Sequence, residues 1–489
     1  MVSEHLPEAL YRAEQVRAMD RYAIEQLKIP GSVLMQRAGS AAFSVLTRHW
    51  PQARSIAVVC GGGNNGGDGY VVARLALDCG FAVKVFALSP PARLSGDAWL
   101  AFEAYRSAGG EVNETLPASF AGFEVVVDAL LGTGLDRQVE GKYAEAISKI
   151  NAFCGGVLAI DIPSGLHADT GAILGQAVAA QATVTFIGLK LGLFTGEGPA
   201  CCGKVWYADL AAQEAIPAGG KPAAWLIAYR NLLPPRRRTA HKGHFGHVLV
   251  VGGEAGFSGA ARMAAEAALR VGAGLVSVAT RKEHAFLNLG RPEIMVHGVE
   301  NPTELEGLLV RATVVAIGPG LGQAPWALAL LEKVLVSSLP LVVDADALNL
   351  LAKAPLKREN WVLTPHPGEA ARLLGTSAAE VQRDRLAALS ALLERYGGVA
   401  VLKGAGTLVG AAGQIPYVCA LGNPGMASGG MGDVLTGTIA GLLAQGLKPL
   451  EAARMGVTVH AAAADKAAAE GERGMLASDL LPWLRRLVN

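Results

Sequence analysis

Short apolar runs alternate along the chain with longer segments of helical spacing, and most runs end in a polar or glycine-rich stretch. A short, continuous apolar run bounded in this way predicts a strand that is buried on both faces. In the first half the predicted strands cover residues 56–60, 82–88, 125–129, 156–161, 182–187 and 204–207, and segments of helical spacing cover 35–50 and 70–79. Strands that alternate with helices indicate a mostly parallel α/β sheet.

The second half repeats the alternation. Its predicted strands lie within residues 247–253, 275–279, 314–322, 341–348, 362–369 and 399–406, and its clearest predicted helices cover 258–271 and 434–447. Between residues 211 and 239 the pattern lapses into Ala, Gly, Pro and Arg, so we place a boundary near residue 220. We expect two α/β domains, residues 1–220 and 221–489, each built as three αβα layers.

Charge argues against a polyanion-binding protein. The formal net charge is +1 and charged residues make up 17% of the chain, whereas binding to nucleic acid needs a basic face. The tight basic run is Arg236 to Arg238, which lies between Pro235 and Thr239 and is typical of a solvated linker. We expect no nucleic-acid partner.

Cysteine usage and hydropathy bear on the compartment. The six cysteines show no C-x-x-C spacing, and no secretory signal opens the chain, so we expect a reducing cytoplasm. The runs 170–189 and 404–432 lack charged residues for twenty positions or more, but Gln, Thr, Asn, Gly and Pro interrupt them. Neither run is expected to cross a membrane.

Polar residues follow the predicted strands of the first half. Asn64, Asn65 and Asp68 lie in GGGNNGGDG after the first strand, which matches neither a dinucleotide-binding G-x-G-x-x-G nor a P-loop. Asp128 ends a later strand, and Asp161 with Ser164 follows the next. Each Asp alone could cap a helix. Together at one sheet edge, these oxygen atoms suit a hard cation or a sugar-phosphate partner.

The stretch 422–437, GNPGMASGGMGDVLTG, is the strongest signal of the second half. A glycine-rich turn that leads into a helix lets backbone N–H groups converge on an anion and predicts a phosphate-binding loop. Asp433 stands in the first predicted turn of that helix. It could cap the helix, or it could be the base that takes a proton from an attacking hydroxyl group.

Further strand ends of the second half carry candidate residues. Lys403 begins KGAGT, a second loop suited to anions, and His366 and Glu369 lie in TPHPGE, although a lone His or Glu is more often structural or on the surface. The histidines 241, 244 and 247 raise a zinc alternative. Their spacing in a loop that contains Gly is poor for converging metal ligands.

The motifs of both halves resemble known families. The second half resembles the ribokinase-like superfamily through GGMGD and, within it, the nicotinamide nucleotide hydrate dehydratases through HKGHFG, GFSGAARMA, GPGLG, DADALN, TPHPGE, LKGAGT and GNPGMASGGMGD. The first half looks like the matching epimerase, a Rossmann-like domain, through GNNGGDG, VVDALLGTGL and DIPSG. Essentially the whole chain is similar to the bifunctional NAD(P)H-hydrate repair enzymes of bacteria.

This resemblance implies a reaction. NADH and NADPH slowly gain water at C6 of the nicotinamide ring, which gives R and S hydrates that dehydrogenases cannot use. The epimerase of the family interconverts the hydrates, and the dehydratase converts the S form back to NAD(P)H at the expense of ADP, giving AMP and phosphate. Hydrated NADH or NADPH, ADP with Mg²⁺ and a potassium ion are therefore the implied ligands, and assembly into a homo-oligomer is expected.

The resemblance also implies site residues. In the epimerase the substrate is expected to contact Asn64, Asn65, Gly66, Gly67, Asp68, Gly132, Thr133, Gly134, Leu135, Asp136, Arg137, Gln138, Tyr143 and Asp161. Asp161 is the implied acid/base, and the implied potassium ligands are Asn65, Asp128 and Ser164, a set of oxygen donors.

In the dehydratase the nucleotide is expected at Lys403, Gly404, Ala405, Gly406, Thr407 and Gly432, and the hydrate at Ala260, Gly320, His366 and Asp433, the implied base. Glu369 lies where related kinases place a residue that orients Mg²⁺ through water. Two alternatives stay open from the sequence. The second half could phosphorylate a vitamin alcohol instead, and the first half could be a binding module without activity.

Overall fold

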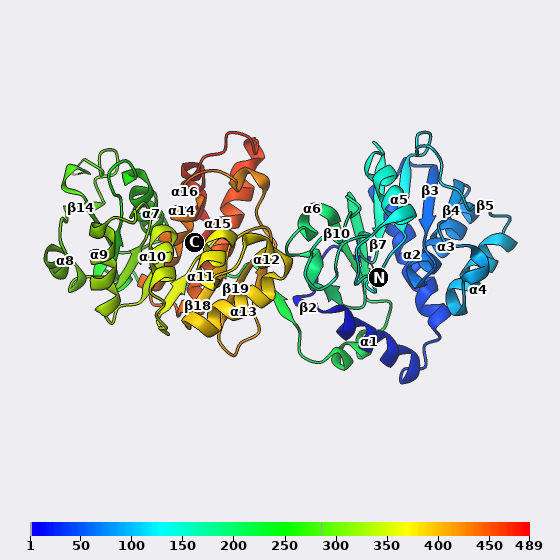
Figure 1. The fold of residues 1–489 in the computed structure, drawn as a ribbon, viewed down its shortest axis with the longest axis horizontal. Helices are drawn as coiled ribbons and strands as arrows, with labels where there is room; N and C mark the ends of the chain where they lie inside the picture. The colour runs from blue at the N-terminus through cyan, green and yellow to red at the C-terminus, as the bar shows by residue number, and fades with distance from the viewer. Residues whose placement is uncertain (1, 285) are drawn as a thin grey trace. The chain divides into compact units, whose positions relative to one another are not determined.

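The computed structural model describes residues 2–284 and 286–489, and the chain divides after Leu226 into two compact units. The first unit is built on a twisted sheet with the strand order β1-β10-β8-β7-β6-β3-β4-β5 (Figure 1). In that order the strands are Val2–Ser3, Lys204–Ala208, Ala182–Phe186, Gly156–Ile160, Val125–Ala129, Ser55–Cys60, Ala82–Ala87 and Val112–Asn113. All neighbours pair in parallel except β1 with β10, so most carboxyl ends meet at one edge.

Helices cover both faces of this sheet because alternate strand residues are apolar on both. Val58 and Val127 pack with residues of α1 (Ala13–Glu25), α2 (Gly31–His49), α3 (Asn64–Asp78) and α4 (Gly96–Ser107), whereas Val59 and Val126 pack with α5 (Gly141–Asn151). A short helix, α6, spans Gly198–Cys202. Within this unit a small second sheet places β2 (Ala9–Tyr11) between β11 (Ala224–Leu226) and β9 (Leu189–Lys190).

The start of α3 differs from the prediction. The sequence predicted a turn over 61–69 and a helix over 70–79, but the helix begins at Asn64. The glycines serve close packing rather than a turn, since a Cβ on Gly66 would lie 2.2 Å from the carbonyl oxygen of Gly61. Asn64, Asn65 and Asp68 therefore stand on the first two turns of a helix at the sheet edge.

The second unit has a sheet of order β14-β13-β12-β15-β16-β17-β18-β19-β20. These strands are Met295–Gly298, Leu275–Thr280, His247–Val251, Val314–Ile317, Leu341–Val343, Trp361–Leu363, Val399–Leu402, Thr407–Ala411 and Tyr417–Cys419. The strands pair in parallel from β14 to β18, and β19 and β20 continue antiparallel.

Helices again lie on both faces of the second sheet (Figure 1). One face packs against α7 (Ser258–Arg270), α14 (Met431–Ala444), α15 (Pro449–Ala467) and α16 (Leu481–Leu487). The remaining helices are α8 (Pro302–Leu309), α9 (Pro325–Val336), α10 (Ala345–Lys353), α11 (Pro367–Leu374), α12 (Ala378–Arg383) and α13 (Arg385–Tyr396), of which α13 packs on β18 and β19. The predicted α/β class, with helices on both faces of each sheet, is confirmed.

Two predicted strands of this unit run into helices, where the sequence predicted polar or glycine-rich turns. The runs 341–348 and 362–369 leave the sheet at Val343 and Leu363, and helices begin at Ala345 and Pro367. His366 is the N-cap of the second helix, since its Nδ1 accepts from the N–H groups of Gly368 and Glu369. An apolar run alone could not reveal this change, because short buried strands and helix starts have the same composition.

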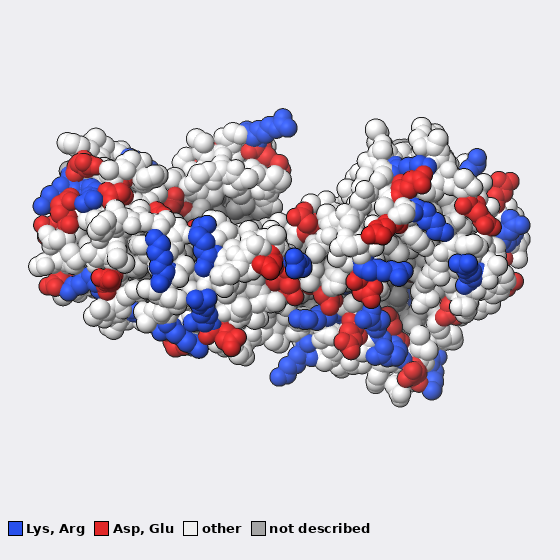
Figure 2. Space-filling view, in the orientation of Figure 1, with Lys and Arg blue, Asp and Glu red and all other residues white. Residues whose placement is uncertain are grey.

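Charged side chains of both signs are interspersed over each unit on the face that Figure 2 shows. This distribution agrees with the near-zero net charge of the chain. Within residues 2–284 and 286–489, no helix combines the length and the apolar character that a membrane span requires.

Candidate functional sites

A cavity of about 630 Å³ lies at the carboxyl edge of the first sheet. Of the residues predicted for the first site, its lining includes Asn64, Asn65, Asp68, Gly132, Thr133, Gly134, Leu135, Asp136, Arg137, Tyr143 and Asp161. Gly66 and Gly67 do not line it and instead allow α3 to pack closely. Gln138 lies outside the lining as well. The strand ends thus bring most of the predicted set to one hollow.

Asp161 is held firmly at the wall of this cavity. It follows β7 with a φ of 66°, a left-handed conformation that is uncommon for Asp, and its N–H donates to the Val184 carbonyl at 2.7 Å. Lys190 donates a hydrogen bond to Asp161 Oδ1 and forms an ion pair with it. Lys190 also lines the cavity, although none of the predicted motifs contains it.

Asp20 and Asp68 are two of the further carboxyl groups that line the same cavity. Burial raises the pKa of Asp20 to about 6, with Lys190 opposing the shift and Asp161 adding to it. Burial, with repulsion from Asp161 and Asp20, raises the pKa of Asp68 well above its usual range. The cavity therefore contains a carboxyl group that burial biases toward its protonated form, beside the ion-paired Asp161.

Asp128, Ser164 and Asn65 meet beneath the cavity. Asp128 accepts from the Ser164 hydroxyl at 2.6 Å and from the Ser164 N–H at 2.8 Å. Leu131 connects Asn65 to this pair, because its carbonyl accepts from Asn65 Nδ2 at 3.1 Å and its N–H donates to Ser164 Oγ at 2.8 Å. Burial raises the pKa of Asp128 to about 6, although the Ser164 hydrogen bonds oppose the shift.

These residues fit the oxygen ligands of a cation. Asn65 Oδ1 is buried and, among the described residues, has no hydrogen-bond partner. A buried carbonyl oxygen without a donor costs free energy, and a cation beside it removes that cost and also favours the ionised form of Asp128. The donor set is oxygen only, which suits a hard cation such as potassium.

In the second unit the glycine-rich stretch leads directly into α14. Gly430 occupies the N-cap in the left-handed conformation with a φ of 91°, so Asp433 stands in the first turn and is not the cap residue. The helix N-terminus points its free N–H groups toward the edge where the predicted nucleotide residues lie. Asp465 of α15 anchors the stretch by accepting from the N–H of Gly422 at 3.0 Å and from Asn423 Nδ2 at 2.9 Å.

A buried charge cluster lies beside this helix start. Lys403 Nζ is 2.7 Å from Asp344 Oδ1 and 3.7 Å from Glu369 Oε2. The Thr436 hydroxyl donates to Asp344 Oδ2 at 2.7 Å. Gly432 packs over the ammonium, since a Cβ there would lie 3.3 Å from Lys403 Nζ. The structure thus brings the ends of β16, β17 and β18 to the start of α14.

This cluster sets the protonation of Asp433. Burial, followed by repulsion from Asp344, raises the pKa of Asp433 to about 7, and Lys403 limits the shift. Burial also raises the pKa of Glu369, while Lys403 opposes it. A carboxyl group with a pKa near neutrality can take up and release a proton at physiological pH, as a general base must.

The predicted hydrate residues lie around the same edge. Gly320 has a φ of 57°, and a Cβ there would lie 3.2 Å from the Ala260 Cβ and 2.4 Å from the Phe257 carbonyl oxygen. Ala260 and Gly320 are thus neighbours. His366 Nε2 lies 3.4 Å from Glu369 Oε1, and burial, with Lys403 nearby, lowers the pKa of His366.

The predicted nucleotide loop, residues 403–407, is supported from behind by Arg385. Arg385 is 1% exposed and donates to the carbonyls of Leu402 at 3.1 Å and Lys403 at 3.2 Å. Burial lowers the pKa of Arg385 to about 10. Gly404 and Ala405 are exposed. The loop is therefore accessible on one side and fixed on the other.

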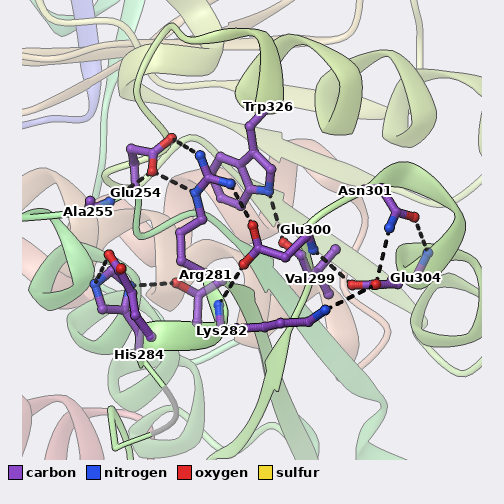
Figure 3. A network of polar contacts seen from close by, with 12 residues as sticks. Glu254, Ala255, Arg281, Lys282, His284, Val299, Glu300, Asn301, Glu304 and Trp326 are labelled. Atoms are coloured by element: carbon purple, nitrogen blue, oxygen red, sulfur yellow. Dashed lines mark hydrogen bonds and ion pairs between the residues drawn. The ribbon is translucent and has the colours of Figure 1, made fainter.

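A polar network steadies the loop after β12, which borders Gly320 (Figure 3). Arg281 donates to Glu254 at 2.7 and 3.1 Å and to Glu300 Oε2 at 2.8 Å, and its guanidinium lies over the ring of Trp326. The N–H of Glu254 donates to the Gly320 carbonyl at 2.6 Å. Arg281 thus connects the hydrate side of the site to two other segments of the unit.

A larger cavity, of about 720 Å³, lies away from these residues, where α7, α14 and α16 end. Three of its four lining arginines have partners within the unit. Arg270 and Arg291 both pair with Glu266, at 3.3 and 2.6 Å, and Arg236 donates to the Gly272 carbonyl. Cations at helix C-termini stabilise the helix dipole, which explains their presence without a ligand.

Lys190 and Asp344 belong to the two sites, although neither was predicted from the sequence. Both carried a usable signal. Lys190 ends a long run without charge, and Asp344 directly follows a buried strand as Asp161 does. The histidines of the zinc alternative lie elsewhere, with His241 and His244 stacked ring on ring at 3.7 Å and His247 bonded to Ser277.

Comparisons with known proteins cover both units. A family model for NAD(P)H-hydrate dehydratase matches residues 248–486, and a model for the YjeF-related protein N-terminus matches residues 31–192. A bifunctional NAD(P)H-hydrate repair enzyme from Coxiella burnetii is 52% identical over 98% of this chain and 99% of its own length. The enzyme of that name from Escherichia coli is 47% identical over 99% of this chain and 95% of its own.

Among solved structures, an ADP/ATP-dependent NAD(P)H-hydrate dehydratase from Bacillus subtilis is 30% identical, with a TM-score of 0.48. The matched region covers 52% of this chain and 93% of the Bacillus subtilis chain.

Proposed function

The chain belongs to the family of bifunctional NAD(P)H-hydrate repair enzymes, and from this premise we propose how its two sites divide the repair. The cavity of the first unit interconverts the R and S hydrates of NADH and NADPH. The second unit dehydrates the S form with ADP as phosphoryl donor. The observation that carries this proposal is the position of Asp433, whose pKa is raised to about 7 between a glycine-rich helix start and a buried lysine.

The dehydratase step reuses phosphoryl transfer. Hydroxide is a poor leaving group, so the C6 hydroxyl attacks the terminal phosphorus of ADP while Asp433 takes its proton, and AMP leaves. The lone pair of ring nitrogen N1 then expels phosphate from C6, and loss of a proton from C5 restores the ring of NAD(P)H. Because the pKa of Asp433 is about 7, its carboxyl group is ionised in a large fraction of molecules at neutral pH, as a base must be.

Binding of the nucleotide is assigned to Gly432 and to residues 403–407. The exposed Gly404 and Ala405 present backbone to the phosphates, and the α14 N-terminus adds its dipole. Lys403 supplies a buried positive charge near the transferred phosphoryl group. Mg²⁺, when bound with ADP, neutralises phosphate charge, and Glu369 is the residue assigned to orient it through water.

The epimerase step is assigned to Asp161 with Asp68. The carboxylate of Asp161 takes the proton of the C6 hydroxyl as the C6–N1 bond breaks, and the neutral Asp68 gives a proton to N1. The resulting C6 aldehyde then rotates, and N1 attacks its other face to close the ring. Asp68 takes back the proton of N1, Asp161 returns its proton to the C6 oxygen, and the configuration at C6 is inverted. Asn65, Asp128 and Ser164 would hold a potassium ion as oxygen ligands, with Asn65 Oδ1, which has no hydrogen-bond partner among the described residues, as the supporting observation.

The test is recovery of NADH from a mixture of R and S hydrates. With the purified chain and ADP, complete return of the NADH absorbance is expected, and parallel assays with ATP and with hydrated NADPH give the preferences. Rapid return of only the S fraction would contradict the epimerase assignment. ATP-dependent phosphorylation of a hydroxymethylpyrimidine or thiazole, without dehydration, would contradict the dehydratase assignment.

The variant Asp161→Ala distinguishes an active epimerase in the first unit from a binding module without activity. We expect conversion of R to S to fall by about a hundredfold, as for a lost acid or base, whereas a module would leave it unchanged.

We further propose that the enzyme works in the reducing cytoplasm, where its six free cysteines persist, and as a homo-oligomer. Light scattering of the purified chain tests the homo-oligomer, and cell fractionation tests the cytoplasmic location.

A further inference from the structure

We propose that Lys190 is a positioning residue of the first site, whose ammonium pairs with the carboxylate of Asp161 and holds it turned toward the cavity. The inference rests on the proposed epimerase function. It adds to that function a residue which none of the predicted motifs contains. The hydrogen bonds, the burial and the backbone position of Lys190 each support this role.

The hydrogen bonds require the charged form of Lys190. Its Nζ lies 3.0 Å from the Phe186 carbonyl, which can only accept, and 3.0 Å from Thr185 Oγ1. The Thr185 hydroxyl is assigned as donor to Asp161 Oδ1 at 3.4 Å, so it accepts from Lys190. With the bond to Asp161 itself, all three N–H groups of an ammonium are used. The group is a fixed cation with no donor to spare for substrate.

Burial of the Lys190–Asp161 ion pair costs free energy that its packing alone does not recover. The side chain of Lys190 is 1% exposed and that of Asp161 is 17% exposed, so of these two cavity-lining groups the carboxylate is the more accessible. A buried ion pair is often no more stabilising than apolar side chains of similar volume. The left-handed φ of Asp161 adds backbone strain, which tends to persist at functional sites. Both costs serve the orientation of one carboxylate.

The backbone of Lys190 is fixed independently of the main sheet. Lys190 lies in β9, which pairs with β2 of the small second sheet through Tyr11. Its side chain reaches from there to Asp161, at the carboxyl end of β7. The ammonium is therefore anchored by one sheet, and the carboxylate by the other.

The surrounding ionisable groups explain why an ammonium is needed. Other elements bring to this cavity Arg17 and Asp20 from α1, Asp68 from α3, Asp97 from α4, Asp136 and Arg137 from the loop after β6, and Tyr143 from α5. Asp20 and Asp68 repel a third negative charge. Burial disfavours the charged forms of Asp20 and Asp68, whereas the ammonium of Lys190 forms its ion pair with Asp161.

The test compares Lys190→Met and Lys190→Arg with a matched control, Lys149→Met. Lys149 forms an exposed i,i+4 pair with Glu145 on α5, so its loss removes an ion-paired ammonium far more open to solvent. Conversion of the R hydrate is measured from pH 5 to 9. Thermal unfolding of each variant reports whether the first unit is folded, and consumption of the S hydrate by the second unit is the internal reference for activity.

We expect Lys190→Met to lower the rate of R conversion about a hundredfold, with S consumption unchanged. The acidic limb of its pH–rate profile should move to higher pH by a unit or more, because a nearby ammonium favours an ionised carboxylate. Lys190→Arg keeps the charge and should recover at least a tenth of the rate and the original limb. Lys149→Met should match the wild type.

The outcomes separate the two proposals. If the wild-type chain does not convert the R hydrate, the proposed epimerase function fails, and this inference with it. If the wild type converts it and Lys190→Met does so equally well, only the role of Lys190 is overturned. A slower Lys190→Met enzyme with an unmoved acidic limb would also overturn that role, because a loss of packing alone lowers the rate without shifting the limb.

Discussion

The ammonium of Lys403 lies 2.7 Å from Asp344 Oδ1, so a single buried ion pair joins the ends of β16 and β18. Glu369, which follows β17, approaches the same ammonium at 3.7 Å. Asp433 faces this cluster from the start of α14, and its pKa responds to all three groups. The chemistry assigned to the second unit therefore depends on the electrostatic interaction of Lys403 with the carboxyl groups around it.

Removal of that charge should destabilise the second unit. Lys403→Met leaves Asp344 and Glu369 buried without a cation, and we expect a loss of roughly 3–5 kcal/mol at pH 8. The loss should shrink as the pH falls toward 5, because burial raises the pKa of Glu369 and a carboxyl group that takes up a proton no longer needs the cation. Thermal unfolding at both pH values measures it. Equal losses at pH 5 and 8 would show that the lysine acts through packing instead.

Asp433→Asn should abolish dehydration while ADP still binds. An amide of the same shape cannot take the hydroxyl proton, so we expect a fall in turnover of about a hundredfold or more. Calorimetric titration with ADP and Mg²⁺ checks that the affinity for the nucleotide changes little. Turnover near that of the wild type would remove Asp433 from the role of base.

The wild-type dehydratase should become faster as the pH rises through about 7, the pKa of Asp433. A carboxyl group whose pKa is raised on folding stabilises the protein most below its unfolded pKa, and that stability is lost as the pH rises through its folded pKa. Asp433→Asn should therefore raise the melting temperature relative to the wild type at pH 8, and by less at pH 5. The two pH series are run on the same variant, and a larger gain at pH 5 would contradict the raised pKa.

Potassium should stabilise the first unit in a pH-dependent way. Ionised Asp128 is buried, and its pKa is raised to about 6, so above that pH a cation beside it offsets the cost of its charge. We expect potassium chloride to raise the melting temperature more at pH 8 than at pH 5. Choline chloride at equal ionic strength is the control.

The variant Asp128→Asn completes this experiment. It should abolish the potassium effect at pH 8 and slow conversion of the R hydrate, while consumption of the S hydrate continues. A potassium shift of equal size in the variant would place the ion elsewhere.

Arg281→Met should loosen the hydrate side of the second site. The change leaves Glu254 and Glu300 without their shared partner (Figure 3), and we expect a loss of about 1–3 kcal/mol. Because the loop of Glu254 is bonded to Gly320, the KM for the hydrate should rise severalfold, with the KM for ADP unchanged.

Lys333→Met is the control for Arg281. It removes an ion pair with Glu306 that is much more exposed and should cost less than about 1 kcal/mol, with neither KM altered. Equal effects of the two variants would mean that the Arg281 network has no special role.

The sequence alone determined the fold class and the sheet edges at which the candidate residues gather. Buried strands have continuous apolar runs, and in a parallel sheet the residues that follow each run meet at one edge, so the order of residues is enough to group Asp128, Asp161 and Ser164. The same reasoning placed Asp433 at a helix start. These inferences needed only local patterns and a topology in which the strands run parallel.

Only the tertiary structure decided which charges meet. Lys190 comes to Asp161 from a separate small sheet, and Lys403 comes to Asp344 across many intervening residues. The start of α3 at Asn64 likewise depends on how closely glycines let a helix approach its neighbours. Charge pairing, burial and the resulting pKa values are functions of distance in space. A local pattern shows which residues stand at an edge, whereas only packing fixes their separations.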